Sequence, residues 1–261
     1  MDAGEIVVLE NCRFNVGESD NNENLAKKYA ALTDIFVMDA FGTAHRKQAS
    51  TYRIAQFCPK VCAGQLLYSE LAALEKVMTN PKSPMVAIVG GSKVSTKLSI
   101  LDSLADKVDQ LILGGGIANT FLKAQGFNIG NSLHENDFID SAKKIIQKLE
   151  SRGASLPLVT DVICGKQLNE NEIAVKKNIN DLEPTDMIFD LGSETMKGIT
   201  QNLKQSKTIL WNGPIGVFEF DQFSKGTETL AHAIANSIGF SLAGDRKEHT
   251  SELQSRCTIS Y

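Results

Sequence analysis

The chain has 261 residues, of which 42% are hydrophobic and 22% are charged, and its formal net charge is −4 at pH 7. This composition is that of an ordinary globular protein, and the acidic balance argues against a nucleic-acid or membrane-surface partner. An apolar run of about 18 residues, as a membrane span requires, is not present. The start of the chain lacks the pattern of a signal peptide, and the five scattered cysteines favour reduced thiols in a cytoplasmic protein.

Short apolar runs alternate with helical patterns along most of the chain. Strands are expected at 6–9, 35–38, 85–89, 110–113, 158–163, 187–190, 208–211 and 240–243. Helices are expected at 23–32, 66–78, 94–104, 118–124, 137–150, 196–203 and 226–235. Continuous apolar strands joined by helices predict an α/β fold built from doubly wound parallel sheets with both faces covered.

The helix that ends before Pro81 divides this pattern into two parts. The preceding part supplies only two strands, whereas the following part can form a nearly complete doubly wound domain of about six strands. We therefore predict an incomplete first domain over 1–64, an interdomain helix over 65–80 and a second domain over 81–244. Residues 245–261 are polar and lack apolar periodicity, so we expect them to be a non-native tail.

The strand expected at 85–89 leads directly into two glycines and then into Lys93 and Lys97. Glycines at a strand-to-helix turn allow a ligand to approach the backbone, and the start of a helix favours anions. Residues four apart lie on one face of a helix, so both ammonium groups can share a polyphosphate there. Solvated lysines after an ordinary tight turn are an equally compatible interpretation. The pattern is not a Walker A loop, because Thr96 rather than glycine precedes Lys97.

Arg13 follows the first expected strand, and Arg46 follows the second in a loop that contains Gly42. Arginine presents a fixed fork of donors that matches phosphate and carboxylate oxygens. Because ligands bind beyond the carboxyl ends of parallel strands, the two arginines can bind a small dianion together. For either arginine alone, solvation or pairing with Glu10 or Asp39 is the favoured alternative.

Three further strand ends in the second domain carry small or polar residues. Gly115 lies in a run of three glycines that suits a flat ring against the backbone, with helix–strand packing as the alternative. Gly192 follows a similar strand end. In the loop after the strand at 208–211, Asn212 can bind phosphate oxygens and Glu219 can accept hydrogen bonds from ribose hydroxyls.

Five segments together, LENCRFN, DAFGTAHR, VGGSKVSTK, LGGGIANTFLK and WNGPIGVFEF, resemble phosphoglycerate kinases in their order and spacing. The resemblance covers residues 1–244. It implies two α/β domains joined by a helix, the first binding 3-phosphoglycerate or 1,3-bisphosphoglycerate and the second binding ADP or ATP with Mg²⁺. The implied activity is the glycolytic, reversible transfer of a phosphoryl group between 1,3-bisphosphoglycerate and ADP, in a monomeric cytoplasmic enzyme.

The resemblance also implies a role for each matching residue. Arg13 and Arg46 resemble the arginines that bind the substrate phosphate, and Lys93 and Lys97 the lysines beside the transferred phosphoryl group. The nucleotide-binding positions are expected to be Lys97, Gly115, Gly192, Asn212 and Glu219. Transfer is expected to be direct and in line, so that catalysis depends on positioning and on positive charge.

The chain departs from the family pattern in two places. About the first hundred residues of the family, with the first substrate motifs, have no counterpart, and the family's Gly-Gly-Asp-Thr region is replaced after Gly244. Asp245 is out of register with the aspartate that contacts the metal, so no metal ligand is assigned. We expect lowered nucleotide affinity and no measurable turnover from this chain alone.

Two other functions remain as alternatives. A non-catalytic nucleotide-binding module would bind Mg-ADP tightly without turnover. A nicotinamide-dependent dehydrogenase is suggested only by the α/β pattern, and the dinucleotide-binding glycine fingerprint is absent from the sequence.

Overall fold

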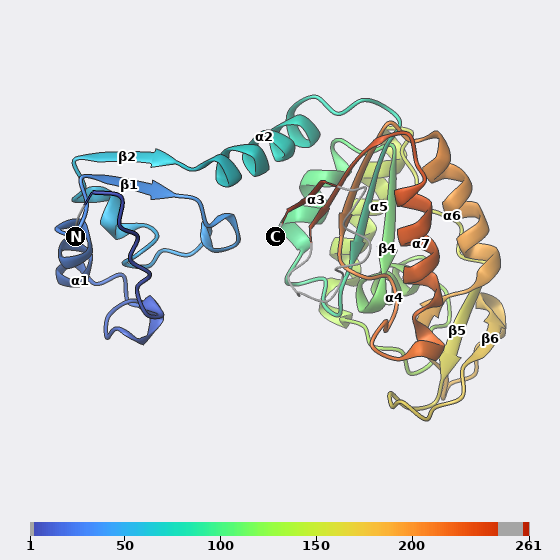
Figure 1. Cartoon of the computed structure of the whole chain (residues 1–261). Helices are drawn as coiled ribbons and strands as arrows, with labels where there is room; N and C mark the ends of the chain where they lie inside the picture. The colour runs from blue at the N-terminus through green and yellow to red at the C-terminus, as the bar shows by residue number, and fades with distance from the viewer. Residues whose placement is uncertain (1–2, 245–257, 261) are drawn as a thin grey trace. The chain divides into compact units, whose positions relative to one another are not determined.

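A computed structural model describes residues 3–244 and 258–260 of the chain (Figure 1). It divides into two compact units, the first extending to Glu75 and the second running from Lys76 to Ile259. The division falls within helix α2 (Gln65–Thr79), which confirms the helix predicted at 66–78. The tail predicted from residue 245 lies, apart from 258–260, outside the described residues.

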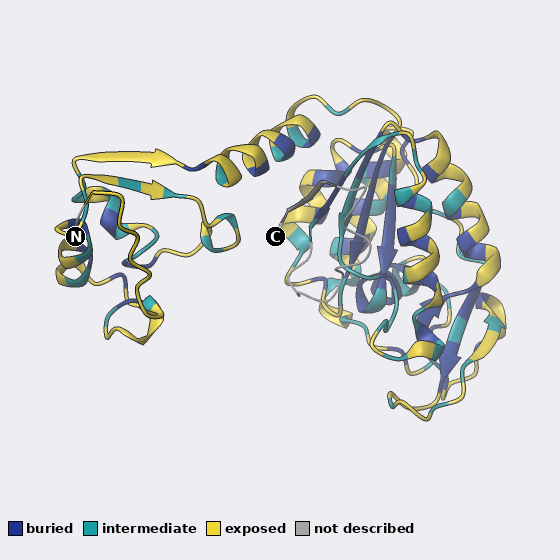
Figure 2. Cartoon of the chain, in the orientation of Figure 1, coloured by how far each residue is buried: buried dark blue, intermediate teal, exposed yellow. Residues whose placement is uncertain are grey.

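The first unit contains few regular elements. They are the 3-10 helices η1 (Cys12–Phe14), η2 (Phe41–Thr43) and η3 (Arg53–Gln56), helix α1 (Glu23–Ala30), and strands β1 (Ile35–Met38) and β2 (Lys60–Ala63). The two strands pair in parallel, with Ile35 opposite Lys60 and Met38 opposite Ala63. Every residue of β2 is exposed, and Figure 2 shows the contrast between this pair and the buried strands of the second unit.

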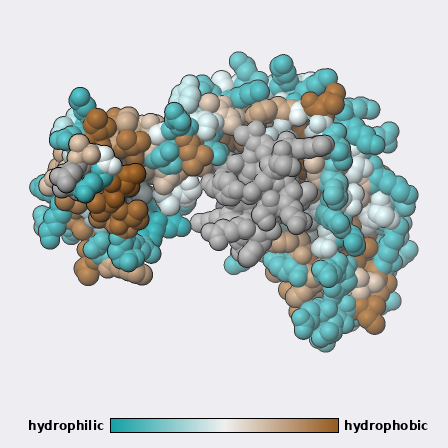
Figure 3. Space-filling model, viewed as in Figure 1, coloured by the Kyte–Doolittle hydropathy of each residue, from teal (hydrophilic) through white to brown (hydrophobic). Residues whose placement is uncertain are grey.

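The strand predicted at 6–9 is wrong. Ile6, Val8 and their neighbours form no ladder with either strand, and both side chains are 90% exposed. A strand exists only when its backbone groups pair with a neighbouring strand, and β1 and β2 pair with each other instead. Apolar side chains therefore gather on the surface of the first unit, at the left of Figure 3.

The second unit is built on a five-stranded sheet in the order β10-β9-β8-β3-β4. Its strands are β3 (Met85–Gly90), β4 (Gln110–Gly114), β8 (Thr208–Asn212), β9 (Phe240–Gly244) and β10 (Thr258–Ser260). The pairs β3–β4, β3–β8 and β8–β9 are parallel, and all six residues of β3 are buried. The expected α/β fold with parallel sheets is confirmed here.

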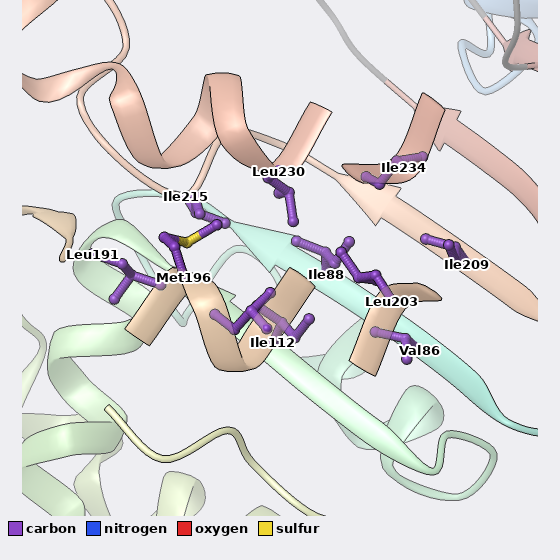
Figure 4. Packing of buried hydrophobic residues seen from close by; sticks show 11 residues of the cluster. Val86, Ile88, Ile112, Leu191, Met196, Leu203, Ile209, Ile215, Leu230 and Ile234 are labelled. Carbon is purple, nitrogen blue, oxygen red and sulfur yellow. The ribbon is translucent and has the colours of Figure 1, made fainter. Parts of the chain in front are cut away.

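In the described part of this unit, the α-helices are α3 (Leu98–Ala105), α4 (Gly115–Ala124), α5 (Ile139–Ser151), α6 (Ser193–Gln205) and α7 (Lys225–Ala235), and the 3-10 helices are η4 (Asn136–Phe138), η5 (Ile179–Asp181) and η6 (Asp221–Phe223). Side chains of α6 and α7 pack with one face of β3, β4 and β8 in a single cluster that includes Ile88, Ile112 and Leu203 (Figure 4). On the other side of the sheet, α5 contacts both α3 and α4 (Figure 1).

Three strands depart from the predicted parallel arrangement. β5 (Asp161–Gly165) pairs antiparallel with both β6 (Val175–Asn178) and β7 (Met187–Leu191) in a separate three-stranded sheet. The strand expected at 158–163 begins only at Asp161, and Leu158 is 77% exposed. The apolar runs predicted the strands at 158–163 and 187–190 but not their direction. A buried strand has the same continuous apolar pattern whether it pairs in parallel or antiparallel.

Candidate phosphate and nucleotide site

Four parallel strands of the second unit end at the same edge of their sheet. Gly90 at the end of β3 is paired with Gly114 at the end of β4, and Asn212 at the end of β8 with Gly244 at the end of β9. The register of β3 and β8 places Val89 opposite Asn212. The loops that follow β3 and β8 and the start of α4, which follows β4 directly, therefore meet at one carboxyl edge, which is where ligands bind in open α/β sheets.

Lys97 joins two of these strand ends. Its Nζ atom donates hydrogen bonds to the carbonyl oxygen of Gly90 at 2.6 Å and to that of Asn212 at 3.2 Å, and also to Oδ1 of Asn212. These three acceptors, two backbone carbonyls and one side-chain amide oxygen, fix the position of the ammonium group. The structure thus brings together two of the residues predicted to meet the nucleotide phosphates.

Glycine is required where these two loops and the start of α4 touch. A Cβ atom on Gly90 would lie 1.7 Å from the carbonyl oxygen of Pro214, which belongs to the loop after β8. Gly115 has a φ of +63°, and a Cβ atom there would lie 2.7 Å from the carbonyl oxygen of Gly91. Only glycine allows these backbones to approach so closely, so the edge is lined by backbone rather than by side chains.

The prediction that Lys93 and Lys97 lie on one helix face is wrong. Helix α3 begins at Leu98, four residues later than expected, and Lys97 is its N-cap residue with a non-helical backbone. Lys93 lies in the preceding loop with an exposed side chain. The helix cannot begin earlier because the loop is held against α4, where the Ile117 amide donates to the carbonyl oxygen of Gly91 at 3.1 Å.

The loop after β8 is held by side chains that the motif analysis did not assign to the site. Trp211 Nε1 donates to the carbonyl oxygen of Gly213 at 2.8 Å. Thr227 Oγ1, on α7, accepts from the amides of Ile215 and Gly216 at 3.2 and 3.3 Å. Glu219 lies further along the same loop and is exposed, so its carboxylate is available to a ligand.

Asp190, at the end of β7, is the clearest residue that sequence reasoning left without a role. It is 2% exposed, and its carboxylate accepts a 2.6 Å hydrogen bond from the Gly226 amide at the start of α7. Burial raises the pKa of Asp190 to about 7, although bonds from Gly226 and Leu191 oppose this shift. A Cβ atom on Gly216 would lie 2.3 Å from Oδ1 of Asp190, so the Asp190 carboxylate packs directly against the loop after β8.

Gly115 and Gly192, both expected to bind the nucleotide, occupy different surroundings. Gly115 lines a small pocket together with Asn119, Phe189, Asp190 and Ile215, among others. Gly192 instead precedes α6, where a Cβ atom would lie 2.2 Å from the Asp161 carboxylate. That carboxylate accepts from the Glu194 and Thr195 amides at 3.1 and 2.7 Å, so Gly192 makes room for a carboxylate cap on α6.

Arg13 and Arg46 both lie in the first unit, and both are exposed. Their alternative partners are engaged elsewhere: Glu10 accepts from the Asn11 amide at 2.9 Å, and Asp39 accepts from the Leu67 amide at 2.9 Å. Within residues 3–244, neither guanidinium has an ion-pair partner. Both groups are therefore available to an anionic ligand.

Among the residues that the structure describes, no group of three or more His, Cys, Asp and Glu side chains is placed to hold a metal ion. Asp245, which the sequence placed near the expected metal position, lies outside the described residues. Over the same described ranges, none of the helices is both long and apolar enough for a membrane span.

The fold and the site define an α/β protein whose second unit gathers glycine-rich loops and a lysine at the carboxyl edge of a parallel sheet. The model of the phosphoglycerate kinase family matches residues 1–259. The chain belongs to the phosphoglycerate kinase family.

Individual relatives agree with this assignment. A phosphoglycerate kinase of Francisella philomiragia is 57% identical over 242 residues, which are 93% of this chain and 62% of the relative. The structure of phosphoglycerate kinase from Coxiella burnetii matches with a TM-score of 0.86 and 50% identity, covering 95% of this chain and 65% of that one. That from Pyrococcus horikoshii matches with a TM-score of 0.77 and 28% identity over 92% of this chain and 62% of its own length. The chain thus spans about 62% of the curated relative.

Proposed function

We propose that this chain carries the nucleotide-binding part and a portion of the substrate-binding part of a phosphoglycerate kinase. The reaction is reversible phosphoryl transfer between 1,3-bisphosphoglycerate and ADP, which gives 3-phosphoglycerate and ATP. The observation that carries this proposal is the meeting of Gly90, Lys97 and Asn212 at the carboxyl edge of the second sheet. A lysine held among backbone carbonyls at such an edge is suited to nucleotide phosphates.

Each site residue has a proposed role in this reaction. Lys97 and Lys93 neutralise the phosphoryl group during transfer, since phosphoryl transfer depends on positioning and on positive charge. Asn212 binds the nucleotide phosphates, Glu219 the ribose hydroxyls, and Gly115 the adenine ring. A role for Gly192 in the adenine pocket stays a prediction, although its position beside Asp161 favours a structural task. Arg13 and Arg46 bind the phosphate of the glycerate substrate.

Mg²⁺ is expected to accompany the nucleotide. Magnesium is usually held by one or two carboxylates together with substrate phosphates. The oxygens of Gly90 and Asn212 that accept from Lys97 Nζ are carbonyl and amide oxygens rather than carboxylates. These residues do not form a magnesium site, and no catalytic step is assigned to the metal.

The 261-residue chain alone is expected to give no measurable turnover. Its first unit has a two-stranded sheet in which every residue of β2 is exposed. Arg13 and Arg46 are therefore not held in a packed site. Free thiols at Cys12, Cys58, Cys62 and Cys164 support the proposed cytoplasmic location.

Calorimetric titration with Mg-ADP tests the nucleotide role. The wild-type chain is expected to bind, and Glu219→Gln is expected to lower affinity for ADP while leaving the far-ultraviolet circular dichroism unchanged. Glu150→Gln, an exposed glutamate on α5, serves as the matched control. No heat of binding up to millimolar ADP would contradict the proposal, and binding with full turnover would contradict the expected inactivity.

A further inference from the structure

The loop from Gly91 to Lys97 is held by one carboxylate from a distant part of the chain. Glu135 Oε2 accepts a 2.9 Å hydrogen bond from the Ser95 amide, and Oε1 accepts a 2.7 Å hydrogen bond from the Ser95 hydroxyl. Both carboxylate oxygens thus engage the residue two positions after Lys93. The five motifs do not include Glu135.

The backbone of Glu135 is itself fixed to helix α4. Its amide donates to Thr120 Oγ1 at 3.1 Å, and this fully buried hydroxyl donates in turn to the carbonyl oxygen of Gly116 at 2.8 Å. Two residues earlier, the carbonyl oxygen of Leu133 accepts from Asn119 Nδ2 at 3.1 Å. The carboxylate therefore extends from a backbone that is anchored to α4.

The same helix also holds the beginning of the lysine loop. The Ile117 amide donates to the carbonyl oxygen of Gly91. A Cβ atom on Gly116 would lie 2.1 Å from the carbonyl oxygen of Ser92. Lys93 thus lies between two points, Gly91 and Ser95, that are both fixed to α4, directly or through Glu135. Its side chain remains exposed.

We propose that Glu135 is a positioning residue for Lys93, fixing the backbone of the loop so that the exposed ammonium group is presented to the nucleotide phosphates. This inference rests on the proposed nucleotide site. A loop fixed in advance costs less conformational entropy when the ligand binds. Glu135 also occupies the Ser95 amide, so the phosphates are met by the lysine side chain rather than by this backbone donor.

The charge of Glu135 agrees with this role. Hydrogen bonds from Ser95 lower the pKa of its carboxyl group, and a bond from the Val94 amide and the charge of Lys93 act in the same direction. The carboxylate is therefore ionised at neutral pH, the form that accepts two hydrogen bonds at once.

Calorimetric titrations with ADP and with adenosine test the proposal on wild type, Glu135→Ala, Lys93→Ala and the double variant. Glu135→Ala is expected to weaken ADP about fivefold, within the usual range for coupled residues, and to leave adenosine binding unchanged. In the Lys93→Ala background, Glu135→Ala is expected to cause no further loss. Glu135→Asp, which keeps the charge, is expected to restore part of the ADP affinity, and Glu150→Ala is the matched control.

Three outcomes would overturn the positioning role: ADP affinity unchanged in Glu135→Ala, equal losses for ADP and adenosine, or a loss that persists undiminished without Lys93. Should Glu135→Ala fail to fold, Ser95→Ala removes only the 2.7 Å hydroxyl bond and is expected to give a smaller loss for ADP alone. Failure of the wild-type chain to bind ADP would overturn the proposed function as well. Binding by wild type that Glu135→Ala retains in full would overturn this inference alone.

Discussion

The two units of this chain have similar apolar sequence runs but bury them very differently. In the second unit, Ile88 and Ile112 are 0% exposed between helices and neighbouring strands, whereas Ile35 on β1 of the first unit is 51% exposed. The difference lies in the neighbouring strands: β3 has a parallel neighbour on each side, whereas β1 has a single neighbour, β2, among the strands that the structure describes. An apolar run forms a strand with a defined end only when neighbouring strands fix its register. Such a defined end is what places residues in a site.

The largest effect is expected from matched truncations in the two units. Ile112→Ala removes a fully buried side chain and is expected to cost the second unit about 2–5 kcal/mol of unfolding free energy. Ile35→Ala is expected to change stability by about 0.5 kcal/mol or less, because the side chain is half exposed. Urea unfolding followed by Trp211, which lies in the second unit, measures the first effect, and amide exchange measures the second. Equal losses would show that the two units are packed alike.

An intermediate effect is expected from the pH dependence of the second unit. Burial raises the pKa of Asp190 from 3.8 to about 7, so the native protein holds the Asp190 proton more tightly than the unfolded chain does. This contribution to stability is fully present below pH 3.8 and is lost as the pH rises through about 7. Urea unfolding at several pH values is expected to show wild type losing stability relative to Asp190→Asn over this range. A constant difference between the two proteins would contradict the shift.

A smaller effect is expected from the cap of helix α1 in the first unit. Asn22 Oδ1 accepts a 3.0 Å hydrogen bond from the Leu25 amide. Asn22→Ala is expected to cost about 1 kcal/mol, as loss of an N-cap usually does. Amide exchange is expected to accelerate in α1 and to stay unchanged in β3. Acceleration in both elements would show that the units unfold together.

Much of the second unit could be predicted from its sequence. The runs at 85–89, 110–113 and 208–211 predict β3, β4 and β8, because buried strands are continuously apolar. Glycines and lysines after these strands mark the edge where Lys97 meets Asn212. The direction of β5 and β7 was not predictable, because it depends on pairing between segments distant in the chain.

The supports of the site could not be predicted. Asp190, Thr227 and Glu135 act through contacts with residues 11 to 40 positions away, and no local pattern marks them. The delayed start of α3 has the same origin, because the loop before it is fixed by α4 rather than by its own helical propensity. The motifs predicted candidate site residues, and the folded chain shows which contacts hold the loops that carry them.

The most direct test of the central claim is a map of amide chemical-shift changes as ADP is added to the isotopically labelled chain. We predict changes confined to the second unit, at Gly90–Lys97, Gly115–Ile117 and Asn212–Phe220, with none in α1 or β1. Such a pattern would assign nucleotide binding to the carboxyl edge of the five-stranded sheet. Changes centred in the first unit, or none at saturating ADP, would contradict the account.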